Sequence, residues 1–130
     1  MKIQNTNLCW IEINTQNLDH NIQIYKQKLP KNNQIVAMIK SNAYGHGSLL
    51  ISNHLEKNPL VHAFCVVNSE EAILLRKNGI KKPILVVGVI NSILEDIVTQ
   101  DIEITIYNLQ LAHDLNKVAA GKNKIAQVHI

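Results

Sequence analysis

Residues 35–47 read IVAMIKSNAYGHG, an apolar run that passes directly into a polar turn containing two glycines. The first five residues form the kind of continuous apolar segment that buried strands of parallel sheets have. A helix is expected after the turn, from about Ser48 to Lys57. The stretch therefore predicts one strand–turn–helix unit.

The same unit repeats toward the end of the chain. Apolar strands are expected at residues 63–67, 83–87, 103–107 and 125–130, and helices at 69–79, 92–99 and 109–120. Asn68 or Ser69 can cap the first of these helices, and capping also accounts for Glu70 and Glu71 in its first turn. Alternation of strands and helices indicates parallel pairing with right-handed crossovers, so the fold class is α/β.

The segment before residue 35 differs from these units. Residues 10–14, WIEIN, alternate as a short strand does. Thr15 can cap a following helix, which Pro30 ends. The apolar positions of that helix have helical spacing; they are Leu18, Ile22, Tyr25 and Leu29.

Two architectures accommodate five such strands. One is a doubly wound open sheet of flavodoxin-like size, which would be complete at this length. The other is the N-terminal portion of a TIM-type (β/α)8 barrel, which would be truncated. Periodicity does not choose between them, but a last strand at residues 125–130 with no helix after it favours the truncated barrel.

Composition narrows the classes of function. The chain has 130 residues, 46% of them hydrophobic and 18% charged, which is typical of a single globular domain. A net charge of +3 is too small to indicate binding to nucleic acid or a membrane surface. No apolar run is long enough to span a bilayer, and the polar N-terminus is unlike a signal peptide.

The cysteines and histidines point to no metal site. Cys9 and Cys65 form no CxxC pattern, which favours reduced thiols and a cytoplasmic location. The histidines outside the turn lack metal-ligand spacing; they are His20, His54, His62, His113 and His129.

Lys40 is the first candidate for chemistry. It follows the strand at residues 35–39, and ligands of α/β folds bind at the carboxyl ends of the strands. A lysine in a partly dry site there can act as nucleophile or base. A lysine that only reaches into solvent fits the same position.

Residues 39–47, IKSNAYGHG, resemble the cofactor signature of alanine racemases, VKA(N/D)AYGHG. Three further segments resemble other stretches of that family in the same register: the opening at residues 10–13, the EEA and LRxxGI pattern within 68–80, and the strand PILVVG at 83–88. The resemblance therefore covers the whole chain.

The resemblance implies a fold and an activity. Residues 1–130 would be the N-terminal part of a barrel domain that binds pyridoxal 5′-phosphate (PLP), without the C-terminal half of the barrel or the β-rich domain that follows it. The complete enzyme would be a homodimer that converts L-alanine to D-alanine for peptidoglycan. Related serine and broad-specificity racemases share the lysine and the tyrosine of the signature and remain alternatives.

The resemblance also implies roles for individual residues. Lys40 would hold PLP and serve as the base on one face of the substrate. Tyr44 would donate its hydroxyl to the cofactor phosphate, and Val87 would line the cofactor. Gly45, His46 and Gly47 would shape the turn.

Racemisation needs a second base on the opposite face of the reacting carbon. In the family this base is a tyrosine from the C-terminal domain of the partner subunit. Tyr25, Tyr44 and Tyr107 do not match that motif. The 130-residue chain by itself is therefore expected to be inactive, or to bind PLP without turnover.

Overall fold

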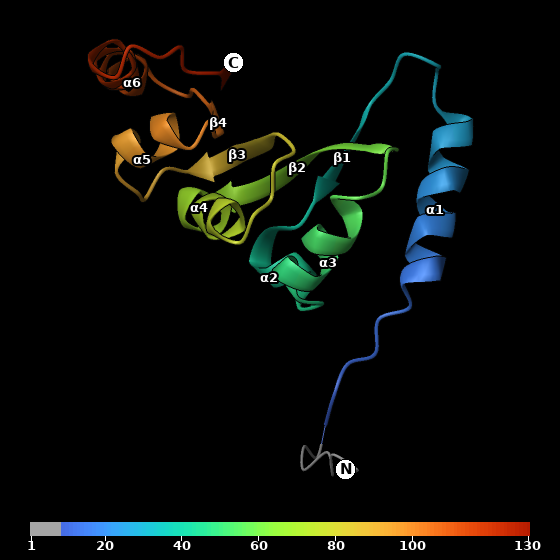
Figure 1. Ribbon diagram of the computed structural model, residues 1–130. Coiled ribbons are helices and arrows are strands. Elements are labelled where there is room, and N and C mark those ends of the chain that lie inside the picture. Colours follow the sequence, from blue (N-terminus) through green and yellow to red (C-terminus); the bar gives the residue numbers. More distant parts are fainter. Residues whose placement is uncertain (1–8) are drawn as a thin grey trace.

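The computed structural model describes residues 9–130 and contains one five-stranded sheet (Figure 1). All neighbouring strands are parallel, and they lie in the order β1-β2-β3-β4-β5. Their bounds are β1 Ile35–Met38, β2 Val61–Asn68, β3 Ile84–Val89, β4 Glu103–Thr105 and β5 Val128–His129. A doubly wound sheet reverses its strand order, whereas a barrel keeps its strands in sequence. The barrel interpretation is confirmed.

The sequential order of the strands also explains where the helices lie. When every crossover is right-handed, parallel strands in sequence place their connecting helices on one face of the sheet. Figure 1 shows α3, α4 and α5 on the same side of the strands. The bounds are α1 Thr15–Lys28, α2 Lys40–Tyr44, α3 Ser48–Leu55, α4 Ser69–Lys77, α5 Leu94–Thr99 and α6 Leu109–Gly121.

The core lies between this layer of helices and the sheet. The register pairs Phe64 with Ile84 and Val66 with Val86, so these side chains share the helix-covered face. Phe64, Ile84 and Val86 are completely buried there, together with Ile104 of β4. β-Branched side chains suit such a pleated, packed surface, which agrees with the isoleucine-rich composition.

The opposite face of the sheet is open. Val36 and Met38 of β1 are 48% and 40% exposed, and Val87 of β3 is 42% exposed. The prediction that residues 35–39 form a fully buried strand is therefore wrong. β1 is an edge strand with only one covered face, so its exposure alternates along the chain.

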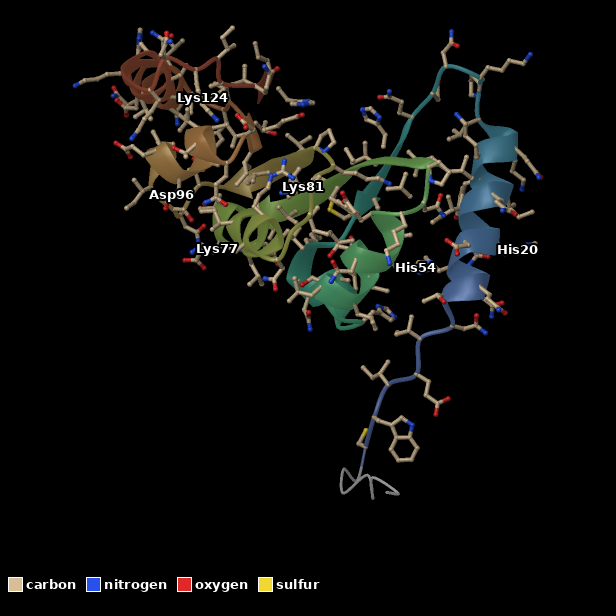
Figure 2. The ribbon with its side chains drawn as sticks, in the orientation of Figure 1. His20, His54, Lys77, Lys81, Asp96 and Lys124 are labelled. Carbon is tan, nitrogen blue, oxygen red and sulfur yellow. The ribbon has the colours of Figure 1, made fainter. Side chains whose placement is uncertain are left out.

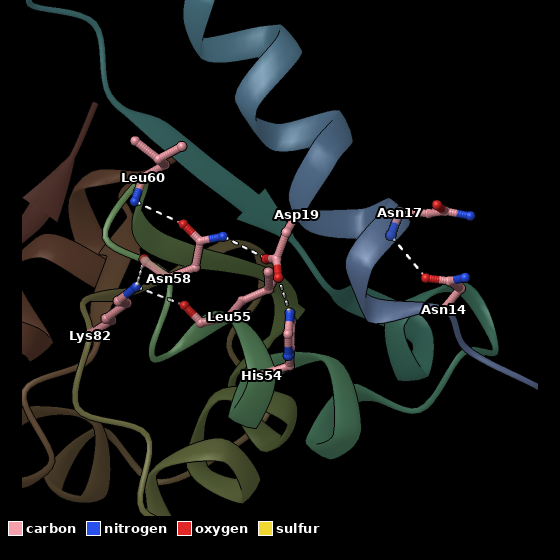
Figure 3. A network of polar contacts seen from close by, with 8 residues as sticks. All are labelled: Asn14, Asn17, Asp19, His54, Leu55, Asn58, Leu60 and Lys82. Atoms are coloured by element: carbon pink, nitrogen blue, oxygen red, sulfur yellow. Dashed lines mark hydrogen bonds and ion pairs between the residues drawn. The ribbon is translucent and has the colours of Figure 1, made fainter.

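The expected strand at residues 10–14 is also wrong. Within the described chain, the segment from residue 9 to 14 has no regular structure, and Trp10 is 61% exposed. A strand needs a neighbour for its backbone hydrogen bonds, and β1 pairs only with β2 among the described residues. The cap of α1 is Asn14 rather than Thr15, because Asn14 Oδ1 accepts from the backbone N–H of Asn17 at 2.9 Å (Figure 3).

Polar side chains connect α1 to the last turn of α3 and to the loop that follows it. Figure 3 shows Asp19 of α1 between His54 and Asn58. His54 Nε2 lies 3.0 Å from Asp19 Oδ2, and Asn58 Nδ2 donates to Asp19 Oδ1 at 2.7 Å. His20 lies on the side of α1 that faces away from His54 (Figure 2). His54 thus helps to hold α1 against α3.

The last strand is shorter than expected. Residues 125–130 were predicted as a strand, but only Val128 and His129 pair with β4. β4 itself has three residues, which limits the ladder that β5 can form. Ile125 is consequently exposed rather than part of the core.

Candidate functional site

The site is built at the carboxyl end of β1. The backbone N–H of Ile39 donates to the carbonyl oxygen of Cys65 at 2.9 Å, so pairing with β2 continues one residue beyond β1. Lys40 comes next, at the edge of the sheet where the parallel strands end. It is the first residue of α2, because Ile39, with φ -125° and ψ 21°, already departs from extended backbone.

The turn after Lys40 has an unusual backbone. Ser41, Asn42, Ala43 and Tyr44 all have φ between 51° and 55°, which makes α2 a left-handed turn of four consecutive residues, none of them glycine. Each costs roughly 1–2 kcal/mol relative to right-handed backbone. The resemblance implied that Gly45, His46 and Gly47 shape the turn. The glycines do have positive φ, but the strain lies in the residues before them.

Hydrogen bonds from within the turn hold this backbone. Ala43 N–H donates to the Ile39 carbonyl at 3.0 Å, and Ser48 N–H donates to Asn42 Oδ1 at 2.8 Å. His46 Nδ1 lies 2.7 Å from the Ala43 carbonyl oxygen and must carry the proton of that bond. His46 therefore shapes the turn, in agreement with its expected role. Strained backbone of this kind persists where the surroundings fix it, and it is common at ligand sites.

The left-handed turn brings Lys40 and Tyr44 together. Lys40 Nζ lies 5.9 Å from the centroid of the Tyr44 ring, and Tyr44 is 60% exposed. Within residues 9–130 the Lys40 ammonium makes no hydrogen bond or ion pair. An amine and a phenol hydroxyl are thus available side by side at the strand ends.

Val87 lies on the open face of β3, away from the Lys40–Tyr44 pair. β2 separates β3 from β1, which puts Val87 roughly 10 Å across the sheet from β1. Its apolar side chain faces outward at 42% exposure. The structure brings Lys40 and Tyr44 together and leaves Val87 on a different strand.

Ser69 organises the neighbouring loop, a role that the sequence analysis missed. Its side chain is completely buried, and its hydroxyl donates to Asn91 Oδ1 at 2.9 Å. The hydroxyl oxygen of Ser69 also accepts from the backbone N–H groups of Asn91 and Ser92, both at 2.9 Å. The loop after β3 is thereby fixed to the start of α4. In the sequence, Ser69 was recognisable only as a possible cap of the helix that follows it.

The available donors suit one class of ligand. A primary amine reacts with an aldehyde, a phenol hydroxyl donates to phosphate oxygens, and an apolar wall packs against an aromatic ring. A phosphorylated aromatic aldehyde such as PLP combines these features. Residues 9–130 contain no group of three side chains that could hold a metal ion, and no helix in this part of the chain could cross a membrane.

Comparison with known proteins identifies the family of the chain. The family model for the alanine racemase N-terminal domain matches residues 13–130. The chain belongs to the alanine racemase family. An alanine racemase of Clostridium kluyveri is 42% identical over 122 residues, covering 93% of this chain and 31% of that protein. Alanine racemase 1 of Caldanaerobacter subterraneus is 38% identical over all of this chain and 34% of its own length.

Solved alanine racemases share the fold. The enzyme of Clostridium difficile 630 superposes with a TM-score of 0.89 at 35% identity, covering 98% of this chain and 33% of that one. A second structure of the same enzyme, in complex with cycloserine, has the same TM-score. The chain spans about a third of the length of the alanine racemases it matches.

Proposed function

We propose that residues 1–130 are the N-terminal part of the barrel domain of a PLP-dependent enzyme that interconverts L- and D-alanine. The observation that carries the proposal is the left-handed turn that places Lys40 Nζ 5.9 Å from the Tyr44 ring at the open end of β1. Relatives named alanine racemases support alanine as the substrate. The product would serve peptidoglycan synthesis in the cytoplasm.

Each residue has a distinct task in this proposal. PLP, when bound, draws electrons away from the Cα of an amino acid and so acidifies its proton. Lys40 would hold the cofactor through its amine, and the free amine would move the Cα proton on one face of the substrate. The Tyr44 hydroxyl donates to the phosphate. Val87 packs against the ring and helps to exclude water.

The second face of the substrate requires another base. Besides Tyr44, the chain has Tyr25 on α1 and Tyr107 just after β4, and both are exposed. Neither matches the family's second base, so we assign that base to the rest of a longer enzyme acting as a homodimer. The 130-residue chain would bind PLP without turnover.

The test of activity uses the full protein that the gene encodes. With PLP and L-alanine, chiral chromatography should detect D-alanine, and L-serine should react more slowly. Lys40→Ala should lower the rate by at least about 10²–10⁴-fold. Lys77→Ala removes an exposed lysine of α4 and should leave the rate unchanged. Absence of D-alanine from the PLP-saturated wild-type protein would contradict the proposal.

Covalent trapping tests cofactor attachment separately. Borohydride reduction in the presence of PLP should place the label on Lys40 rather than on the other eleven lysines of the chain. Tyr44→Phe should weaken PLP retention because it removes the phosphate donor, while Lys40 remains the labelled residue. A label spread evenly over surface lysines would show that no site is formed.

A further inference from the structure

The carboxylate of Glu71 has partners that its place in the helix does not explain. Glu71 is the third residue of α4, and its N–H donates to Oδ1 of the cap residue Asn68 at 2.9 Å. In an ordinary capping box the glutamate would accept from the N–H of Asn68 in return. Instead, Oε2 accepts from Val67 N–H at 3.1 Å and Oε1 accepts from Ser41 N–H at 2.6 Å.

The second of these bonds reaches the candidate site. Ser41 directly follows Lys40 and is the first residue of the left-handed turn, although it lies 30 positions before Glu71 in the chain. A backbone N–H held by a carboxylate makes a stronger bond than one held by a neutral acceptor. Because each carboxylate oxygen has its own donor, the side chain cannot rotate without losing one of them.

We propose that Glu71 is a positioning residue for Lys40. Its carboxylate holds the Lys40–Ser41 peptide against the end of β2 and so fixes the direction in which the Lys40 side chain leaves β1. Helix α4 thereby sets the geometry of the amine without touching it. The inference rests on the proposed function, since it assumes that PLP reacts at Lys40.

Glu71→Gln tests whether the carboxylate must accept from both Ser41 N–H and Val67 N–H. Glutamine has nearly the same size but only one carbonyl oxygen, and its NH₂ group would face one of the two N–H donors. Glu70→Gln is the matched control, because Glu70 is the preceding residue of α4, is exposed, and its side chain makes no hydrogen bond within residues 9–130. Both variants remove one negative charge from the start of the helix.

Two readouts in the full protein test the proposal. In the PLP-free protein, amide hydrogen exchange at Ser41 and Val67 should be at least tenfold faster in Glu71→Gln, with α6 unchanged. The rate of borohydride-trapped PLP attachment at Lys40 should fall at least tenfold in Glu71→Gln. Glu70→Gln should stay within twofold of wild type in both measurements.

The outcomes distinguish this inference from the function on which it rests. Wild-type attachment at Lys40 combined with an unchanged rate in Glu71→Gln would overturn the role of Glu71 and leave the proposed function intact. Failure of the wild type to react at Lys40 would overturn both. If Glu71→Gln does not fold, Glu71→Asp keeps the charge but cannot reach both donors, and it must show the same slowed attachment for the proposal to stand.

Discussion

Gly88 lies so close to Val67 that a Cβ atom on Gly88 would be 2.4 Å from the Val67 carbonyl oxygen and 2.9 Å from its Cγ2 atom. The contact joins β3 to β2 where their register shifts, between Val66 and Asn68. The Val67 carbonyl oxygen belongs to the backbone of a paired strand, so it cannot shift to make room for a side chain at Gly88. The absence of a side chain at Gly88 therefore sets the spacing of the strand ends beside Val87.

Gly88→Ala should lower the free energy of unfolding by about 1–3 kcal/mol, because the added methyl group overpacks this contact. Gly121→Ala is the control, since a Cβ there meets no atom within 4 Å at the end of α6. It should raise stability by about 0.4–1 kcal/mol. Urea titration measures both changes, and equal effects of the two substitutions would refute the argument.

Arg76 joins the loops that follow α4 and α5. Its guanidinium donates at 2.7–3.1 Å to the backbone carbonyls of Ile80, Lys82, Gln100 and Asp101. Burial lowers the pKa of Arg76, and nearby Asp101 opposes that shift. Arg76→Met should lower the free energy of unfolding by about 1–3 kcal/mol, because four carbonyls lose a charged donor and three of these bonds are partly buried.

Two further variants refine the test of Arg76. Arg76→Lys keeps the charge but lacks the planar fork, so it should recover little of the loss. Lys77→Met changes the next residue of α4, which is exposed, and should alter stability by less than about 0.5 kcal/mol. Full recovery in Arg76→Lys on thermal unfolding would show that charge alone matters.

The two thiols should differ in reactivity. Cys9 is exposed, whereas Cys65 is buried in β2, and burial raises the pKa of the Cys65 thiol. Since the thiolate is the reactive form, iodoacetamide should modify Cys9 first and Cys65 at least tenfold more slowly. Mass spectrometry of the wild type and of Cys9→Ser follows the two sites. Rapid labelling of Cys65 in folded Cys9→Ser would contradict the burial.

The raised pKa of Cys65 also fixes the sign of a pH effect. The thiol ionises at lower pH in the unfolded chain than in the fold. Its contribution to stability is therefore complete below the ordinary thiol pKa and is lost as pH rises through the higher pKa of the folded state. Cys65→Ala should make urea stability less sensitive to alkaline pH, and an unchanged pH dependence would argue against the effect.

The open face of the sheet should make the 130-residue chain associate when it is produced alone. Val36 and Met38 are exposed on this face, and such apolar patches bind other apolar surfaces. Val36→Thr combined with Met38→Gln should reduce association and the binding of a dye that reports apolar surface. The control pair, Leu50→Gln and Leu74→Gln, changes exposed residues of α3 and α4 and should have less effect. Sedimentation showing a dye-free monomer in the wild type would refute this prediction.

The sequence by itself determined the local elements and the candidate residues. Apolar runs predicted the four strands from β1 to β4, and the Asn68 cap is confirmed by its bond from Glu71 N–H. The signature at residues 39–47 singled out Lys40 and Tyr44. Strands, helix caps and short motifs depend on residues that are close together in the sequence, so the order of the residues is enough to predict them. The ends of several elements differed, as where β2 extends from Val61 to Asn68, and the strand expected at residues 10–14 is absent.

Tertiary structure decided what depends on the path of the whole chain. Strand order distinguishes the barrel from the doubly wound sheet, and periodicity is the same in both. Four L-residues in the left-handed conformation are unfavourable by themselves, and the turn is held both by local hydrogen bonds and by Glu71 from α4. The bond from Ser41 to Glu71 joins residues 30 positions apart, and the pattern around Glu71 indicated only a helix cap. Contacts of that kind exist only once β1, β2 and α4 have packed together.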